Sequence, residues 1–374
     1  MLIGIDASRA VTPEPTGTEN YSLHVIRTLV NQAREKHRFR LYLRDMPAEG
    51  LLPHDDTVEW RVIGPHRLWT HLGLGLELAR HPPDVLYVPA HVVPLCCRVP
   101  AVATVHDLGY RYYPSTHTPR SRWYLEWSTK HNVHAAERII VDSRATRADL
   151  QKLLGISMDK IIVAYPAGSG DVAPVQDEET IRGVRERHGL DGPYLMSVGT
   201  LHPRKNLGLL VDAFGDMASS VDASPGLRLV LAGKRGWLWE PLLERIRDRG
   251  LRERVICTGY VDPQELSALL TGAVAMVMPS LYEGFGLPIL EAMACNTPVI
   301  CSNASSLPEV AGDAALYVDP EDRAGLQRAM DRLLADDKLR QELIGRGRQR
   351  LRLFSWEQCA EAILAALEEV GGGG

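Results

Sequence analysis

Short apolar runs alternate with amphipathic stretches along most of the 374-residue chain. Such runs are typical of strands buried on both faces of a parallel sheet, and the amphipathic stretches between them are typical of crossover helices. The pattern therefore predicts an α/β fold of doubly wound parallel sheets. In the first half, the expected strands are Leu2–Asp6, Arg38–Leu43, Val58–Ile63, Val85–Val88, Ala101–Val105, Arg138–Val141 and Ile161–Val163. The expected helices are Glu19–Asn31, Leu68–Ala79, Arg120–Ala136 and Arg144–Leu154.

The alternation stops between residues 165 and 193, where prolines, glycines and a short acidic run predict a linker with one short helix. It then resumes to the end of the chain. The expected strands of the second half are Tyr194–Gly199, Leu227–Ala232, Arg254–Thr258, Ala273–Met278 and Pro298–Cys301. The expected helices are Leu207–Met217, Pro241–Arg249, Pro263–Leu270, Leu287–Cys295 and an amphipathic tail from Ser355 to Val370.

Two Rossmann-like domains are expected, because a typical domain has about 100–150 residues. The first spans residues 1–170, a linker spans 171–193, the second domain spans 194–354, and a C-terminal helix spans 355–370. Ligands of such sheets bind at the carboxyl ends of the strands. We therefore expect the functional residues to follow the strands directly.

The composition is that of a water-soluble globular protein, with 45% hydrophobic and 24% charged residues. No apolar run approaches the roughly 18 residues of a membrane span, and the start MLIGIDAS lacks the features of a signal peptide, so a cytoplasmic protein is expected. Residues 1–170 have 20 Lys and Arg against 17 Asp and Glu, whereas residues 171–374 have 22 against 30. Neither half is basic enough to indicate a nucleic-acid partner. Six scattered cysteines without a C-x-x-C pair predict neither a zinc site nor a disulfide framework.

The segment of residues 279–294 carries the most chemical information. A strand is expected to end at Pro279, two glycines follow, and Pro288 stands at the expected start of a helix. The first N–H groups of such a helix and its positive dipole end suit a phosphate. Glu283 and Glu291 flank the turn, so both can face one ligand. Alternatively, Glu291 only complements the helix dipole and Glu283 is a solvated loop residue.

The frame EGFGLPILEAMA in this segment resembles the signature of the retaining glycosyltransferases of family 4. These enzymes transfer sugars from nucleotide donors and have the GT-B fold, in which two Rossmann-like domains flank a cleft. The resemblance covers essentially the whole chain and is strongest in residues 194–320. Other segments that carry it are VGTLHPRKNL at 198–207, LAG at 231–233, TGYV at 258–261, PVI at 298–300, LPEVAG at 307–312 and Ser355-Trp356.

The resemblance implies a nucleotide-sugar donor site on the second domain and an acceptor site on the first domain. It places Glu283 against the donor sugar and Glu291 on the ribose hydroxyls, and it directs backbone amides of residues 284–290 to the sugar and the diphosphate. It also implies that the helix around Trp356 crosses back to the first domain. The other donor-binding residues expected in the second half are Gly233, Tyr260, Val261, Gly284, Phe285, Gly286 and Leu287.

Two neighbouring cations, Arg204 and Lys205, match the basic residues that the family uses after the first strand of its second domain. Breaking the anomeric bond leaves negative charge on the departing phosphate, and cations already in place stabilise that charge. Many relatives have an arginine directly after the glycine of this strand, where this chain has Thr200. We infer that Arg204 takes its place. The alternative is that both cations lie on a surface loop.

In the first domain, His106 ends an expected strand and matches the family histidine that lies beneath the donor sugar, near the reacting carbon. A histidine at a strand end is otherwise more often structural. Asp107 is expected to orient His106 or to cap the next segment. Gly17, in a loop that opens a helix, would let the backbone approach the diphosphate and the acceptor.

Residues 110–136 combine six aromatic residues with four cations and one acid. Such a mixture can rest on an anionic membrane or recognise a lipid-linked or sugar acceptor. The alternative is that the aromatic rings pack under the domain while the arginines stay solvated. A peripheral contact with the inner face of a membrane is therefore one hypothesis for this segment.

We interpret the chain as a retaining, metal-independent hexosyltransferase without a cofactor. No strict D-x-D motif is present, which disfavours the metal-dependent class with a single Rossmann domain, and no G-x-G-x-x-G fingerprint indicates a dehydrogenase. The form VGTLHPRKN looks most like bacterial mannosyltransferases of polysaccharide synthesis. GDP-mannose is the first expected donor, with UDP- and dTDP-sugars as alternatives, and a carbohydrate or lipid-linked acceptor is expected. A nucleotide-sugar epimerase and a non-catalytic sugar-nucleotide-binding subunit remain as other interpretations.

Overall fold

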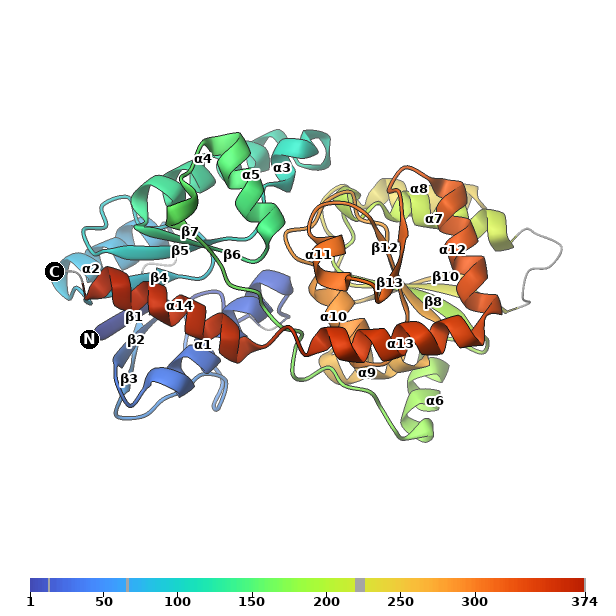
Figure 1. Ribbon diagram of the computed structural model, residues 1–374, viewed down its shortest axis with the longest axis horizontal. Helices are drawn as coiled ribbons and strands as arrows, with labels where there is room; N and C mark the ends of the chain where they lie inside the picture. Colours follow the sequence, from blue (N-terminus) through green and yellow to red (C-terminus); the bar gives the residue numbers. More distant parts are fainter. Residues whose placement is uncertain (13, 65–66, 219–225, 373–374) are drawn as a thin grey trace. The chain divides into compact units, whose positions relative to one another are not determined.

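The apolar runs of the sequence form two parallel sheets in the computed structural model (Figure 1). The structure describes residues 1–12, 14–64, 67–218 and 226–372. The chain divides into two units, each with its own sheet. Unit 1 comprises Met1–Leu108, Thr118–Ala167 and Ser355–Gly374, and unit 2 comprises Gly109–His117 and Gly168–Phe354.

Unit 1 contains a seven-stranded sheet with the order β3-β2-β1-β4-β5-β6-β7. Its strands are β1 (Leu2–Asp6), β2 (Arg38–Leu43), β3 (Val58–Val62), β4 (Val85–Val88), β5 (Ala101–Val105), β6 (Arg138–Val141) and β7 (Ile161–Val163). Its α-helices are α1 (Gly17–Ala33), α2 (Gly75–Arg80), α4 (Pro119–Ala135), α5 (Arg144–Leu154) and α14 (Trp356–Gly371). Helices α1 and α14 pack against each other on one face of this sheet, whereas α2, α4 and α5 share a hydrophobic core with its other face.

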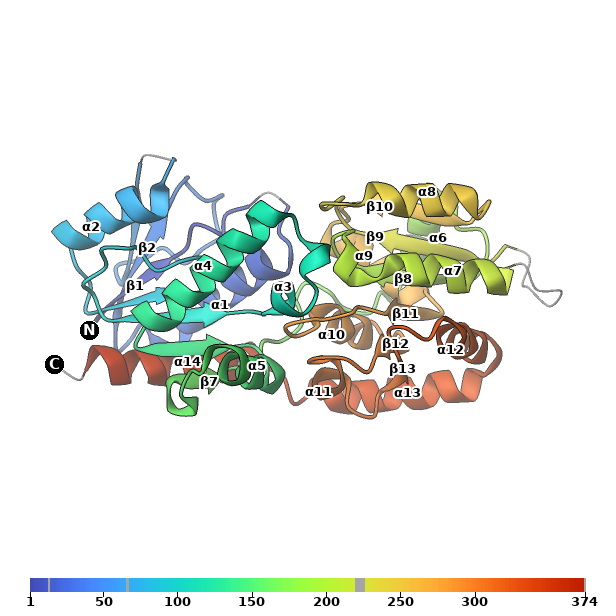
Figure 2. The same cartoon turned by 90° about the horizontal axis from the view of Figure 1, so that it is seen from above.

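Unit 2 contains a six-stranded sheet with the order β10-β9-β8-β11-β12-β13. Its strands are β8 (Tyr194–Val198), β9 (Arg228–Ala232), β10 (Val255–Gly259), β11 (Ala275–Met278), β12 (Val299–Ser302) and β13 (Ala315–Val318). Its longer helices are α6 (Glu178–Arg187), α7 (Leu207–Ala218), α8 (Glu240–Asp248), α9 (Pro263–Gly272), α10 (Leu287–Ala294), α12 (Arg323–Ala335) and α13 (Asp337–Leu351). Helices α7, α8 and α12 cover one face of the sheet, where they enclose the core of the unit (Figure 2).

Two parts of the structure differ from the expected division. The short segment Gly109–His117, which includes helix α3 (Gly109–Tyr112), belongs to unit 2 although it lies within the expected first domain. It is held there because Tyr112 stacks on Tyr282, with ring centroids 5.5 Å apart, and because Trp237 donates its indole N–H to the carbonyl of Thr116. The expected linker also belongs to unit 2, where its helix α6 packs against α9.

One expected helix is not a single α-helix. The segment predicted as Leu68–Ala79 forms a π-helix over Trp69–Leu74 and continues as α2. The change of winding falls at Gly73 and Gly75, the residue type with the lowest helix propensity after proline. The wider turn still buries Trp69, which donates its indole N–H to the carbonyl of Ile63 at 2.9 Å.

Candidate active site

The predicted cations of unit 2 lie on a rigid turn that follows β8. Residues Pro203–Lys205 form a short 3-10 helix, and the next residue, Asn206, has a φ of 55°. The Asn206 amide donates to the carbonyls of Pro279 and Pro320 at 3.1 and 2.7 Å. The carbonyl of Arg204 accepts a hydrogen bond from Leu281 at 2.9 Å. The turn is therefore fastened to the loop that follows β11, which carries Glu283.

Lys205 and Glu283 form a buried ion pair, with 2.9 Å between Nζ and Oε1. Burial acts to raise the pKa of Glu283, but Lys205 and Arg204 outweigh it, so the pKa lies below its usual range. The ammonium of Lys205 rests on Gly199, where a Cβ atom would stand 3.1 Å from Nζ. The alternative that Arg204 and Lys205 lie on a surface loop is thus not what the structure describes. It brings Arg204, Lys205 and Glu283 together at the carboxyl ends of β8 and β11.

Glu291 is 9% exposed on α10, one helical turn after the helix begins. Burial raises its pKa to about 7, and Lys205 opposes this shift, so Lys205 acts on both predicted glutamates. Helix α10 starts after Gly286, which has a φ of 113°, and no side chain caps this start. Pro288 has no N–H, and the N–H of Ile289 donates to the carbonyl of Gly286 at 2.9 Å.

The loop before α10, residues 280–286, is fixed by serines that follow β12. Ser305 accepts a hydrogen bond from the backbone N–H of Glu283 at 2.8 Å. The hydroxyl of Ser306 donates to the carbonyls of Glu283 and Phe285 at 2.9 and 2.7 Å. These bonds hold the predicted residues 283–287 in one conformation, and they were not foreseen because the serines lie some twenty positions further along the chain.

The other predicted donor residues lie at the carboxyl ends of β9 and β10. Gly233 donates its N–H to Gly259 at 2.8 Å, and a Cβ atom on Gly233 would stand only 2.1 Å from the carbonyl oxygen of Gly199. Only glycine fits between these loops. The ammonium of Lys234 lies over the ring of Tyr260, 5.3 Å from its centroid, in a cation–π contact. Val261 is the next residue in the chain.

Two aromatic residues beside the cations were not predicted. His202 stacks on Trp237 with ring centroids 4.6 Å apart and an angle of 5° between the planes, and His117 stacks on the same indole at 5.3 Å. Burial, together with Lys205 and Arg204, lowers the pKa of His202 to about 3, so its ring is neutral. The motif VGTLHPRKN contains His202, but nothing in the sequence indicates its partner on a loop after β9.

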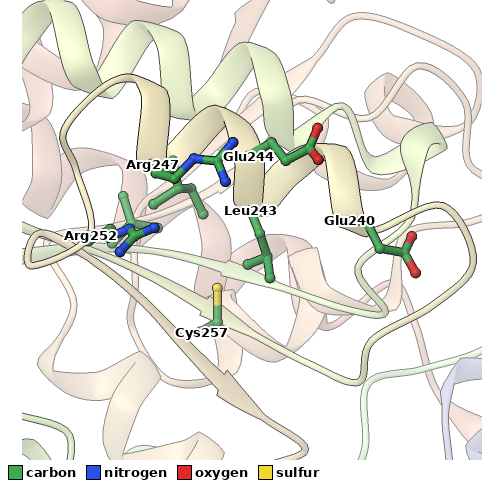
Figure 3. Close-up of a pocket in the computed structure, with 8 residues that line it drawn as sticks. Glu240, Leu243, Glu244, Arg247, Arg252 and Cys257 are labelled. Carbon is green, nitrogen blue, oxygen red and sulfur yellow. The ribbon is translucent and has the colours of Figure 1, made fainter.

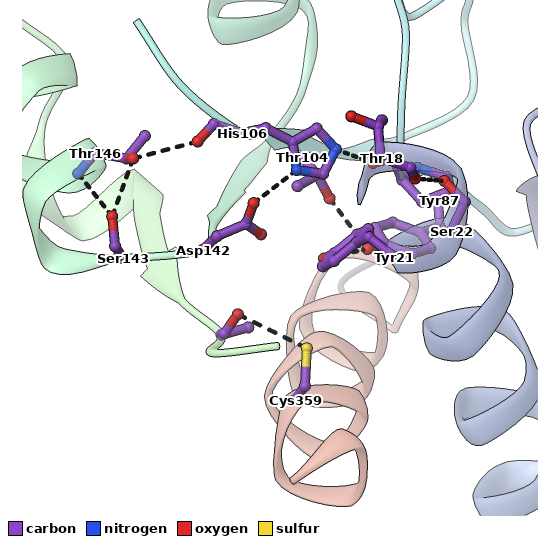
Figure 4. A network of polar contacts seen from close by, with 12 residues as sticks. Thr18, Tyr21, Ser22, Tyr87, Thr104, His106, Asp142, Ser143, Thr146 and Cys359 are labelled. Atoms are coloured by element: carbon purple, nitrogen blue, oxygen red, sulfur yellow. Dashed lines mark hydrogen bonds and ion pairs between the residues drawn. The ribbon is translucent and has the colours of Figure 1, made fainter. Parts of the chain in front are cut away.

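His106 lies at the carboxyl end of β5 in unit 1, and Asp142, after β6, is its main partner (Figure 4). The distance from Nδ1 to the Asp142 carboxylate is 2.7 Å, and Nε2 is 3.0 Å from the carbonyl oxygen of Pro89. Burial alone would lower the pKa of His106, but Asp142 outweighs that effect, and the pKa is raised. Both partners are hydrogen-bond acceptors, and the protonated ring, which the raised pKa favours, donates to both of them. Asp107, expected to orient His106 or to cap the next segment, has a weaker charge effect on His106 than Asp142.

A polar network lies beneath His106 (Figure 4). The ring of Tyr21 meets His106 edge to face at 4.8 Å, and its hydroxyl is 3.2 Å from that of Tyr87. Trp356, at the start of α14, contacts Tyr21 in the same manner at 5.8 Å. The C-terminal helix therefore belongs to the support of His106. Gly17, by contrast, is an exposed residue in the first turn of α1.

A separate hollow of about 550 Å³ lies between α8 and the edge strand β10 (Figure 3). It contains none of the predicted site residues. Its lining residues include Glu240, Leu243, Glu244, Arg247, Arg252 and Cys257. Among the described residues, no group of three or more His, Cys, Asp and Glu side chains is arranged to hold a metal ion.

Comparison with known proteins agrees with this geometry. Residues 180–350 match the model of the glycosyl transferases group 1, and residues 15–167 match that of glycosyltransferase family 4. O-antigen chain mannosyltransferase B of Escherichia coli is 35% identical over 267 residues, which cover 71% of this chain and 69% of that protein. O-antigen chain mannosyltransferase RfbU of Salmonella typhimurium is 28% identical over 64% of this chain and 62% of its own.

Solved structures define the fold class. Sucrose-phosphate synthase of Thermosynechococcus elongatus superposes with a TM-score of 0.77 at 20% identity, covering 100% of both chains. The lipopolysaccharide glycosyltransferase WaaG superposes with a TM-score of 0.74 at 16% identity, also over 100% of both chains. The protein thus has the GT-B fold of two parallel-sheet Rossmann-like units. It belongs to glycosyltransferase family 4.

Proposed function

We propose that the protein transfers mannose from GDP-mannose to a carbohydrate or lipid-linked acceptor with retention of anomeric configuration, without a metal ion or cofactor. The observation that carries the proposal is the turn of Arg204 and Lys205, fastened against the Glu283 loop beside the uncapped start of α10. Two relatives named as mannosyltransferases support the choice of sugar. None of the relatives named above is an epimerase.

In the proposed reaction, the diphosphate of the donor lies against Arg204, Lys205 and the start of α10. The bond from the anomeric carbon to the phosphate oxygen breaks, and a bond from the same carbon to the acceptor oxygen forms on the same face. The acceptor proton passes to the departing phosphate, whose new negative charge the two cations stabilise. Glu291 would hold the ribose hydroxyls and Glu283 the sugar.

The hydrogen bonds of His106 support a mechanism without a histidine base. In its protonated form, the ring donates from Nδ1 to Asp142 and from Nε2 to the carbonyl of Pro89, and it then has no lone pair with which to take a proton. A cationic His106 can instead orient or stabilise an oxygen-rich ligand. This leaves the departing phosphate as the acceptor of the proton.

Transfer assays with GDP-mannose, UDP-glucose and dTDP-glucose test the proposal directly. We expect the highest rate with GDP-mannose, an α-linked product by NMR spectroscopy, and the same rate after treatment with EDTA. Lys205→Ala should reduce kcat by about 10²–10³, the usual cost of removing one charge-stabilising group. Lys338→Ala, which removes an exposed lysine of the same unit, should retain full activity. An inverted product, or a Lys205→Ala enzyme with normal kcat, would refute the mechanism.

We also propose that unit 1 contacts an anionic membrane, where a lipid-linked acceptor would be found. The structure divides the expected aromatic segment: Tyr110 is buried and Tyr112 packs on Tyr282, but Trp123 is 69% exposed on α4. Three leucines spaced four residues apart, Leu68, Leu72 and Leu76, are more than half exposed near it. The ring of His71, which lies between Leu68 and Leu72 in the chain, contacts Trp127 edge to face, with ring centroids 5.8 Å apart. Trp127 in turn stacks on Trp123, with ring centroids 6.5 Å apart.

Exposed arginines at positions 67, 120 and 122 give this surface a positive charge, which suits anionic lipids. Among the described residues, no helix is long and apolar enough to cross a bilayer. Flotation with phosphatidylglycerol vesicles at low salt tests the contact. We expect binding that falls with salt and is lost in a Leu72→Ser, Trp123→Ser double variant. Equal behaviour of this variant and the parent, or dimerisation in place of flotation, would refute it.

A further inference from the structure

The guanidinium of Arg204 lies against the backbone of a segment that is distant in sequence. We call residues 109–117 the covering segment; they follow β5 in the chain but belong to unit 2. A Cβ atom on Gly109, the first of them, would stand 2.6 Å from Nη1 of Arg204 and 3.2 Å from its Cδ. The same atom would stand 2.8 Å from Cδ1 of Tyr282. Two of these distances are shorter than any ordinary Cβ contact, so only glycine leaves room for the arginine in its present position.

Aromatic contacts along the covering segment keep its backbone in place. The ring of Tyr112 stacks on that of Tyr282, with ring centroids 5.5 Å apart and an angle of 20° between the planes. Near the other end, Trp237 donates its indole N–H to the carbonyl of Thr116, and His117 stacks on the same indole at 5.3 Å. The segment is therefore fastened on both sides of its middle and has little freedom to withdraw.

The aromatic partners of the covering segment stand beside the charged residues of the candidate site. Tyr282 directly precedes Glu283 in the chain. Trp237 stacks on His202, and the carbonyl of His202 accepts the backbone N–H of Lys205 at 3.0 Å. The covering segment and the turn that carries the two cations thus form one packed cluster within unit 2.

The cover acts on the side chain of Arg204, whereas other contacts fix its backbone and its neighbour. The carbonyl of Arg204 accepts the N–H of Leu281, and Lys205 is held by its ion pair with Glu283. An arginine side chain has several rotatable bonds, which the contact with Gly109 restricts. Groups that stabilise charge in a transition state have to be in place beforehand, and a displacement of about 1 Å can reduce the rate by about 10².

We infer that Gly109 is a positioning residue of the donor site, because the missing side chain at this point leaves the space in which the Arg204 guanidinium is held. This role rests on the proposed function, in which Arg204 stabilises the departing diphosphate. The covering segment is then a wall of the donor site, although its residues lie between two stretches of unit 1 in the chain.

A double-mutant cycle between positions 109 and 204 tests the inference. Of the atoms that a new methyl group would meet, Nη1 of Arg204 is the end of a flexible side chain, so the guanidinium gives way and the fold is kept. We expect Gly109→Ala to lower kcat by about tenfold to a hundredfold, with a smaller change in KM. In an Arg204→Ala background, the same substitution should have no further effect. Gly183→Ala on α6 is the matched control and should keep the parent kcat, because a Cβ atom there meets nothing within 4 Å.

Binding of inorganic pyrophosphate gives a second readout, which does not require transfer. Calorimetric titration of the full chain should show weaker binding in Gly109→Ala than in the parent. The double variant should bind no more weakly than Arg204→Ala alone.

Urea unfolding shows whether Gly109→Ala keeps the fold. If it does not, Tyr112→Ala takes its place, because Tyr112 is 38% exposed and its loss releases the covering segment from Tyr282. The loss of kcat in Tyr112→Ala should likewise disappear in the Arg204→Ala background.

Three results would overturn the inference: parent values of kcat and pyrophosphate affinity in Gly109→Ala, an effect confined to KM, or a loss of equal size with and without Arg204. Its failure is distinguishable from that of the proposed function. No transfer from any nucleotide sugar, with pyrophosphate binding that depends on Gly109 through Arg204, would refute the proposed transfer and leave the positioning role standing. Transfer from GDP-mannose with full kcat in Gly109→Ala would refute the positioning role alone.

Discussion

Glu283 and Glu291 are buried to a similar degree, yet their pKa values move in opposite directions. Lys205 is in direct contact with Glu283 and compensates for its burial, whereas its effect on Glu291 does not overcome desolvation. The same lysine therefore keeps Glu283 ionised, whereas the pKa of Glu291 stays close to neutral pH. In the proposed donor site, the two carboxyl groups would therefore make different contacts with one ligand.

Replacing Glu291 by glutamine should stabilise the ligand-free protein at alkaline pH. The pKa of Glu291 rises from 4.5 to about 7 on folding, so the stability that it contributes is complete below pH 4.5 and is lost as the pH rises through 7. At pH 8 the charged glutamate costs up to about 3 kcal/mol, which glutamine avoids. Urea unfolding at pH 5 and pH 8 measures the effect. Equal stability of the variant and the parent at both values would contradict it.

Replacing Asp142 by asparagine should lower the pKa of His106 below its ordinary value of 6.5, because burial then acts without the opposing charge. NMR titration of the His106 ring protons measures this pKa, and a His106→Gln variant assigns the resonance. We also expect kcat to fall at neutral pH, where the ring becomes neutral. A titration unchanged by the substitution would show that Asp142 does not hold the charge of His106.

Residues that short sequence motifs carry could be singled out from the sequence, whereas contacts between distant positions could not be predicted. Glu283, Arg204 and Lys205 were found because short motifs carry them. Asp142 lies 36 positions after His106, and their contact depends on β5 and β6 being neighbours in the sheet. The stack of His202 on Trp237 likewise depends on the pairing of two loops.

At the scale of elements, the buried strands were the most predictable part. Apolar runs gave β1, β2, β4, β5, β6 and β7 with the bounds that the structure has. No element was predicted between residues 303 and 354, where α11 (Leu307–Ala311), β13, α12 and α13 lie. Strand β13 is at the edge of its sheet and half exposed, yet residues 314–318 form an apolar run like those of the predicted strands, so its signal was present and was missed.

Helix α14 is an element whose role is testable by a matched pair of variants. Ile363 is fully buried between α14 and the rest of unit 1, whereas Glu361 on the same helix is exposed. Ile363→Ala should lower the free energy of unfolding by about 2–5 kcal/mol through the cavity it leaves. Glu361→Ala should change it by less than about 0.5 kcal/mol. Urea unfolding followed by tryptophan fluorescence compares them, and equal effects would mean that α14 does not stabilise unit 1.

At the scale of the whole molecule, net charge is a poor guide to the ligand. Residues 171–374 carry 30 acids against 22 cations, although this half holds the proposed site for an anionic donor. What matters is local, because Arg204, Lys205 and Lys234 lie at the carboxyl ends of neighbouring strands. Raising the salt concentration should therefore affect donor affinity mainly through these few groups. Lys234→Ala should flatten the salt dependence of GDP affinity measured by calorimetry, and Lys338→Ala should leave it unchanged.

Unit 2 is built from two separate segments of the chain, because it includes the nine residues from Gly109 to His117. The polypeptide passes from one unit to the other after Leu108, His117, Ala167 and Phe354. Consider a hybrid in which residues 168–354 come from a relative. It would keep Tyr112 and His117 of this protein, but the residues that stack on them, at positions 282 and 237, would come from the relative. If unit 2 binds the donor as proposed, we expect an exchange of donor preference between two family members to require both pieces together. Recombination at a single breakpoint would leave each parent's aromatic partners mismatched.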